Sequence, residues 1–303
     1  MRPARLRPVA LLLVALANAA VAAASAPLLW RVERGGRTSH LFGTVHVPLD
    51  LDSALGPEGR AALTDAKRVF LELDFAPGNL LGFLQQAVGR GELPPDRSLH
   101  ALLRRSTWDR LRIATRNHVD PVILDRMEPW FVGLFVVHLA VPHGRVPPGV
   151  RPGLVTLDAQ IDARARQRHI PVEALESTLD HLQVMSRMPR QEAVAMVEEA
   201  IANPDGSREE LEGLVGAYVA ADDRPLRKTF GRLVRRKPVL AERLLFQRNE
   251  AWCERLERWL GDGRMFVAAG TFHMFGDRGL VALLTRRGYR VERVGRLADS
   301  PST

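Results

Sequence analysis

Apolar positions follow two different periods along the chain, and the change between them predicts an α/β protein. Short apolar runs predict strands near both ends and at intervals between them, at 28–32, 39–43, 69–73, 170–176, 265–269 and 289–294. Between residues 80 and 260, apolar residues mostly recur every three or four positions, which is typical of amphipathic helices. This order favours a central mixed β-sheet covered by helices, with a helical insertion that forms a cap. An α+β arrangement of the same elements is the alternative.

The pattern also divides the chain into three segments. Residues 1–26 are expected to be a signal peptide, 27–296 a single domain and 297–303 a disordered tail. Within the domain, we expect the helical cap to come from about residues 79–150 and 178–260, where helical periodicity dominates.

The first segment has the layout of a bacterial secretory signal. Arg2, Arg5 and Arg7 precede an apolar stretch over 9–24, and small residues follow at 22–26. We therefore expect export to the periplasm. If the segment is not cleaved, it could act as a membrane anchor, although a spanning helix needs about 20 apolar residues. No later stretch is apolar enough for an integral membrane span.

Composition narrows the classes of partner. The formal net charge is +8, but the chain has two tyrosines and no aromatic residues within its basic run, so we expect no nucleic-acid partner. The single cysteine, Cys253, excludes an intrachain disulfide and a cysteine-based metal motif. It lies in a helical pattern beside Trp252, so we expect a buried apolar residue rather than a nucleophile.

A short motif occurs twice, 227 residues apart. Leu-Phe-Gly-Thr-Val-His ends at His46, and Ala-Ala-Gly-Thr-Phe-His ends at His273. Each copy follows an apolar strand, and ligands of open α/β sheets bind at the carboxyl ends of strands. Two such strands side by side would bring two imidazoles into one crevice. Imidazole binds zinc, iron, copper or nickel, and also manganese where carboxylates share the site.

Glu72 is the best candidate for a third ligand, because it sits in an apolar run where an unpaired charge is costly. Asp74 lies two residues on and could reach the same site. Weaker candidates have ordinary structural interpretations as well: Glu173 and Glu176 could cap a helix, Asp158 could be an N-cap, and Arg248 could form a surface ion pair. The other histidines, which lack a recurring context, are expected to be structural or exposed: His40, His100, His118, His138, His143, His169 and His181.

The chain lacks the motifs of several large enzyme classes. It has no Gly-x-Ser-x-Gly elbow, Walker loop, dinucleotide fingerprint or His-Glu-x-x-His helix. This argues against serine hydrolases, nucleotide enzymes and zincin proteases.

Taken in order, the segments resemble the TraB/GumN family from about residue 28 to residue 294. The resemblance rests on Leu29–Val32, Leu41–His46, Phe70–Asp74, Leu157–Ala159, Pro171–Ser177, Arg248–Asn249, Ala269–His273 and Gly288–Val291. The sequence departs from the family pattern at Ser177, where threonine is common, and at Gln160, where an aromatic residue or histidine is frequent.

That family is similar to the Tiki proteins, metal-dependent proteases with paired GxxH motifs. The resemblance implies that His46, Glu72 and His273 hold a divalent ion, with manganese or cobalt as the implied metals; zinc or iron would also suit such ligands. It also implies roles for Glu176 and Arg248, which match an acid and a helix arginine of the family.

These observations lead to one main hypothesis and two alternatives. The first is an exported metal-dependent hydrolase acting on a peptide or protein substrate, in which Glu72 or Glu176 is the general base and Arg248 stabilises an oxyanion. The second is a metal- or haem-binding envelope protein without turnover. The third is an accessory factor in envelope or polysaccharide assembly.

Overall fold

A six-stranded mixed sheet forms the centre of the protein, as the sequence predicts. The computed structural model describes residues 28–74, 85–133, 149–151 and 153–295. The strands are β1 (Leu29–Arg34), β2 (Arg37–Thr44), β3 (Arg68–Leu71), β4 (Val172–Ala174), β5 (Met265–Gly270) and β6 (Arg290–Arg293). Their order in the sheet is β4-β3-β5-β2-β1-β6. The α/β prediction is therefore confirmed, while the predicted signal peptide and C-terminal tail lie outside the described residues.

Strand direction fixes where the site forms. β4, β3, β5 and β2 are parallel, so their carboxyl ends share one edge of the sheet. β1 joins β2 through a hairpin and runs antiparallel to it, and β6 runs antiparallel to β1. Gly35 and Gly36 make the tight hairpin turn with positive φ angles of 57° and 73°, which glycine adopts without steric cost.

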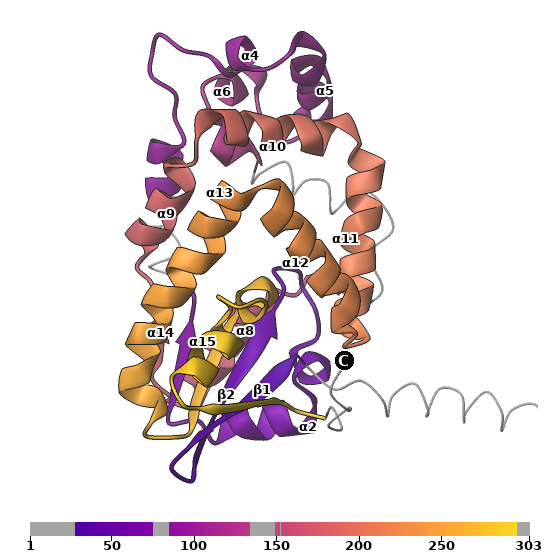
Figure 1. Cartoon of the computed structure of the whole chain (residues 1–303). Helices are drawn as coiled ribbons and strands as arrows, with labels where there is room; N and C mark the ends of the chain where they lie inside the picture. The colour runs from indigo at the N-terminus through magenta and orange to yellow at the C-terminus, as the bar shows by residue number, and fades with distance from the viewer. Residues whose placement is uncertain (1–27, 75–84, 134–148, 152, 296–303) are drawn as a thin grey trace, which may run out of the picture.

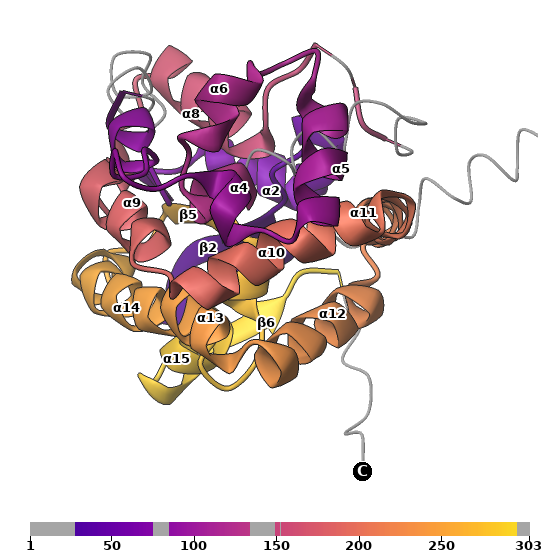
Figure 2. The ribbon, with the colours of Figure 1, turned by 90° about the horizontal axis from the view of Figure 1, so that it is seen from above.

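Helices cover both faces of the sheet (Figures 1 and 2). On one face lie α2 (Leu51–Thr64) and α8 (Leu157–Gln167), and on the other lie α14 (Gln247–Leu260) and α15 (Leu280–Arg286). Each turns an apolar stripe inward; in α14 this stripe comprises Trp252, Cys253, Leu256 and Leu260, all buried in the main core. Cys253 is thus a buried apolar residue, and burial raises the pKa of its thiol to about 11.

A second layer of helices stands beyond the end of the sheet (Figure 1). It comprises α4 (Leu99–Leu102), α5 (Arg105–Thr115), α6 (Pro121–Asp125), α9 (Thr178–Ser186), α10 (Arg190–Ala202), α11 (Pro204–Val219), α12 (Asp223–Arg236) and α13 (Pro238–Ala241). Part of this layer has apolar clusters of its own, one of them around Leu99, Leu111, Leu124 and Val197. Several helices expected in the cap contribute to the main core instead: α14 packs there, as do Val215 and Tyr218 of α11 and Leu226 and Phe230 of α12.

The helical segment from Pro238 to Leu260 is not uniform. It begins as α13, passes through one π-helical turn, η1 (Glu242–Phe246), and continues as α14. Isolated π-helical turns inside α-helices are frequent at functional sites. In this chain the turn lies directly before Arg248, a residue of the candidate site.

None of the helices in the described part of the chain is long and apolar enough to cross a membrane.

Candidate functional site

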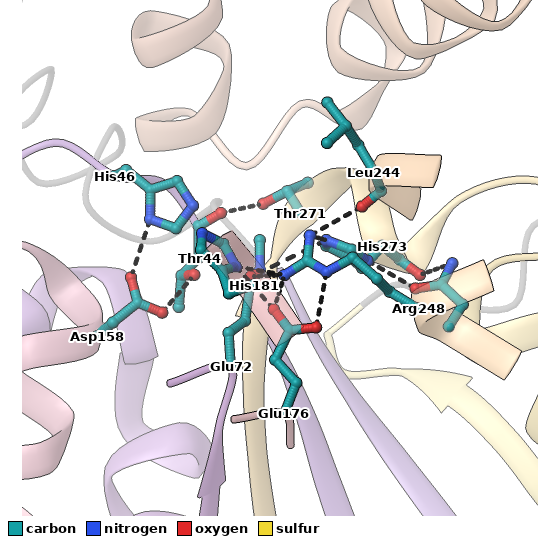
Figure 3. Close-up of polar contacts among 12 residues, drawn as sticks. Thr44, His46, Glu72, Asp158, Glu176, His181, Leu244, Arg248, Thr271 and His273 are labelled. Carbon is teal, nitrogen blue, oxygen red and sulfur yellow. Dashed lines mark hydrogen bonds and ion pairs between the residues drawn. The ribbon is translucent and has the colours of Figure 1, made fainter. Parts of the chain in front are cut away.

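Four parallel strands deliver the main side chains of the site to one edge of the sheet. β2 leads to His46, β3 to Glu72, and β5 to His273, which lies in the short 3-10 helix η2 (Thr271–Met274). β4 ends two residues before Glu176. The structure therefore brings together residues that are up to 227 positions apart, as expected for the carboxyl edge of a parallel sheet. Figure 3 shows these side chains with Arg248, which α14 contributes.

The two Gly-Thr-x-His turns are joined by their threonines. In the parallel pairing of β2 with β5, Thr44 lies opposite Gly270, so the two motifs are offset by one residue. The Thr271 hydroxyl donates to the backbone carbonyl of Thr44 at 2.9 Å. A Cβ atom on Gly43 would stand 3.0 Å from the Thr271 hydroxyl oxygen, so glycine permits this close approach.

The second glycine keeps open a space that three side chains surround. A Cβ atom on Gly270 would stand 3.2 Å from Glu72 Oε1, 3.6 Å from His273 Cδ2 and 3.7 Å from His46 Nε2. The glycine of the first motif thus serves close packing of the turns, and the glycine of the second leaves a cradle between the two imidazoles and the carboxylate.

The structure places Glu72 just after β3, which ends at Leu71, rather than inside the strand as the sequence suggested. Its side chain is 8% exposed. Oε1 accepts a hydrogen bond from the Gly270 N–H at 2.6 Å and lies 3.8 Å from His273 Nε2, while Oε2 accepts from Arg248 Nη2 at 2.7 Å. Burial alone would raise the pKa of Glu72, but His273, Arg248 and His46 outweigh it and hold this pKa far below its usual range.

Arg248 is buried, which rules out the alternative interpretation of this residue as a surface ion pair. Its guanidinium binds both carboxylates: Nη2 donates to Glu72 at 2.7 Å, and Nε and Nη2 donate to the two oxygens of Glu176 at 3.0 and 2.7 Å. Nη1 donates to the Leu244 carbonyl in η1 at 2.8 Å. The indole ring of Trp252 lies 4.5 Å from the guanidinium carbon. Arg248 is therefore fixed from several directions at once.

His273 is held in one tautomer by its neighbours. Asn249 donates through Nδ2 to the backbone carbonyl of Arg278 at 2.8 Å, so its amide oxygen must face the ring, 2.6 Å from His273 Nδ1. The proton is then on Nδ1, and Nε2 presents its lone pair to Arg248 Nη1 at 3.2 Å. Burial, with the nearby charge of Arg248, lowers the pKa of His273 to about 3, so the ring is neutral.

His46 is more exposed, with 60% of its side chain in solvent, and it is oriented by Asp158. Desolvation opposes a charged ring, but the contact with Asp158 and its charge outweigh it and raise the pKa of His46 to about 9. Asp158 Oδ1 accepts from the Thr44 hydroxyl at 2.9 Å. Its buried Oδ2 has no well-formed hydrogen bond within the described part of the chain, and it faces His46 Nδ1 at 3.4 Å.

The sequence suggested that Asp158 could be the N-cap of its helix. In the structure, Thr156 is the N-cap residue of α8, and Asp158 lies in the first turn. There its charge is favoured by the positive end of the helix. Asp74 also differs from expectation, because its carboxylate pairs with Arg166 at 2.7 Å instead of the site. Glu173 pairs with Arg68 and Arg255.

Two residues of the site were not predicted. His181, expected to be structural or exposed, contacts Glu176 Oε1 through Nδ1 at 2.7 Å and lies 3.5 Å from Arg248. Asn249 stands out in the sequence only as the neighbour of Arg248. Burial alone would raise the pKa of Glu176, but hydrogen bonds to His181 and Arg248 lower it. The sequence carries no periodic signal for either role: the contact of His181 is local to the start of α9, and that of Asn249 depends on how α14 packs.

The donor set has the composition of a divalent-cation site. The cradle is surrounded by the Glu72 carboxylate and by two imidazoles, each of which contacts a neighbouring side chain through Nδ1. Proteins orient metal-ligating histidines in this way, by binding the ring nitrogen that does not face the metal. Glu72 Oε1 and His273 Nε2 are 3.8 Å apart, whereas two ligands of one tetrahedral zinc stand roughly 3.4 Å apart. Within the described residues, no three such side chains already stand in a metal-holding arrangement.

Comparison with known proteins gives a family and nothing finer. The model of the TraB/PrgY/gumN family matches residues 28–293, which covers the sheet, the cap and every residue of the site. No curated protein and no solved structure matches the chain.

Proposed function

We propose that this chain, which belongs to the TraB/PrgY/gumN family, is a hydrolase that depends on a divalent metal ion and acts on peptide bonds. The observation that carries the proposal is the cradle over Gly270, which His46, Glu72 and His273 surround. The predicted signal peptide supports a periplasmic location for this activity. Manganese or cobalt is the metal that the resemblance implies.

His46 and His273 would hold the ion through Nε2, and Glu72 through Oε1. Asp158 and Asn249 bind the opposite ring nitrogens, so each imidazole already presents its Nε2 atom on the cradle side. When bound, the ion would polarise the scissile carbonyl and lower the pKa of a bound water toward neutrality.

Arg248 is the cation best placed to stabilise an oxyanion. It lies beside both His273 and Glu72, so negative charge that develops at the cradle would be near its guanidinium. Glu176 holds that guanidinium through two hydrogen bonds. Its place is therefore that of a positioning residue for Arg248.

The general-base role that the sequence suggested for Glu72 or Glu176 is poorly supported. Both carboxylates are bound to Arg248, and the pKa of each is lowered, which makes each a weak proton acceptor at neutral pH. This same observation favours the second candidate function, a protein that holds a metal ion without turnover.

Metal analysis and a peptidase assay test the proposal. The purified protein should bind one divalent ion, and His46→Ala and His273→Ala should each remove most of it. Cleavage of a peptide library should appear with manganese or cobalt and disappear with a chelator. Full metal content in both variants would contradict the shared site, while metal binding without any cleavage would favour the second candidate.

A further inference from the structure

A hollow of about 500 Å³ lies away from the cradle, between the cap and the helices that carry the site. Its wall includes Arg187 at the end of α9, Arg190 at the start of α10, and Arg243 in η1. Glu128 and Trp130, which follow α6, line the other side. Figure 1 shows α9, α10 and α13 meeting in this region.

The wall of the hollow is strongly basic and has few compensating acids. Three guanidiniums share it with one carboxylate, and none of the three forms an ion pair with a residue in the described ranges. Several other surface arginines pair with an acid, as Arg104 does with Glu198 at 2.8 Å. Arg243 uses one donor, Nη1, to bind the Arg187 backbone carbonyl at 2.6 Å, so its guanidinium lies beside the end of α9. Like charges gathered in this way favour an anion between them.

The backbone also contributes positive charge to the hollow, through the N-terminal end of α10. Pro189 is the N-cap residue of α10, and its side chain caps none of the first N–H groups of that helix. The positive end of a 13-residue helix therefore opens beside Arg190, which strengthens the preference for a negative ligand.

Two continuous helical segments connect the hollow with the candidate site. His181, which contacts Glu176, and Arg187 are six residues apart on α9, so the helix separates them by about 9 Å. Arg243 precedes Arg248 by five residues, which corresponds to about 7 Å. An extended peptide covers such a distance with two or three residues, at about 3.3 Å each.

We propose that the hollow binds the C-terminal carboxylate of a peptide whose reacting carbonyl lies at the cradle, two or three residues away. Guanidinium groups match a carboxylate with two parallel hydrogen bonds, and the tryptophan beside them offers an apolar surface to the last side chain. This inference rests on the proposed function and narrows it to the removal of short C-terminal fragments.

Binding to the full chain in the presence of a chelator tests the inference without turnover. Calorimetry should compare alanine peptides of three to five residues that carry either a free C-terminal carboxylate or a C-terminal amide. We expect the free acids to bind about tenfold more tightly, the equivalent of about 1.4 kcal/mol. Arg187→Gln combined with Arg190→Gln should remove this preference.

Arg236→Gln is the matched control, because Arg236 is an exposed arginine at the end of α12, outside the hollow, and it should keep the preference. Thermal unfolding would verify that all variants fold. Equal binding of acids and amides, no binding of either, or an unchanged preference in the double variant would overturn the inference. Arginine-dependent binding of inorganic phosphate without a preference between the peptides would overturn it too.

The binding experiment can succeed or fail independently of the cleavage assay that tests the proposed function. If cleavage never appears with added metal but the acids still bind through the two arginines, the hydrolase proposal fails and the carboxylate site stands.

Discussion

The Thr271 side chain donates a hydrogen bond to the Thr44 backbone carbonyl, so the second Gly-Thr-x-His turn is fastened to the first. The Thr44 side chain in turn binds Asp158, the residue that orients His46. The threonines of the two copies therefore have different contacts: the Thr271 hydroxyl joins the turns, and the Thr44 hydroxyl holds Asp158, which contacts His46. The repeat is a way of building one centre from two distant segments.

Thr271→Val should lower the free energy of unfolding by about 1 kcal/mol, because the Thr44 carbonyl loses a buried donor. It should also lower metal affinity, since the turns are no longer tied. Urea unfolding and metal titration measure both effects. Thr285→Val is the control, because its hydroxyl binds the Val281 carbonyl on an exposed helix. Equal losses in the two variants would argue that the link between the turns has no special role.

Gly270→Ala should weaken metal binding while leaving the fold nearly intact. Gly270 has φ −50°, which alanine adopts without strain, but the added methyl group would enter the cradle 3.2 Å from Glu72 Oε1. Metal content and thermal unfolding give the two readouts. Gly216→Ala in α11, where a Cβ would meet nothing within 4 Å, should leave metal content unchanged. Normal metal content in Gly270→Ala would exclude the cradle as the metal position.

Asn249→Ala should reduce metal affinity by roughly 10- to 100-fold, because nothing then fixes the Nδ1 proton and orientation of His273. It should also destabilise the fold by about 1–3 kcal/mol, since buried polar groups lose their partner. Asn203→Ala, which removes an exposed helix cap, should cost about 1 kcal/mol without any effect on metal. If the two variants bind metal equally well, the role of Asn249 is structural only.

His40 should make the protein less stable in mild acid. Burial lowers the pKa of His40 in the folded state, against the opposing effect of Glu58 3.5 Å away. Since the unfolded chain takes up a proton first, stability should fall as the pH drops below about 6.5 and level off below the folded pKa. His40→Gln should flatten urea-unfolding stability between about pH 7 and about pH 5. His169→Asn, at an exposed position with positive φ, should keep the slope of the parent protein.

The strands and their shared edge could be predicted because they depend on short-range pattern. Apolar runs identified all six strands, and parallel strands end on one edge whatever their order. This is why the sequence alone suffices to group His46, Glu72 and His273. The offset of one residue between the motifs depends on strand register and has no such signal.

The partners of these residues were harder to predict, because helix packing decides them. Asp158 has the sequence context of a cap, yet tertiary contacts turn it toward Thr44 and His46. His181 has no recurring context, and it meets Glu176 because it lies in the first turn of α9, five residues further along the chain. Arg248 occurs in an amphipathic helix like many surface arginines, and its burial depends on carboxylates from two strand ends.

The π-helical turn at 242–246 contributes one backbone carbonyl, that of Leu244, to the candidate site, where it binds Arg248. The position of Arg248 therefore depends on the length of this segment. Such a turn amounts to one residue inserted into an α-helix. Removing one of its five residues would let the segment close as a regular α-helix, in which each backbone carbonyl accepts from the N–H four residues further along the chain. The Leu244 carbonyl, which now accepts from the Arg248 side chain, would then be engaged within the helix, and Arg248 would lose one of the contacts that fix it.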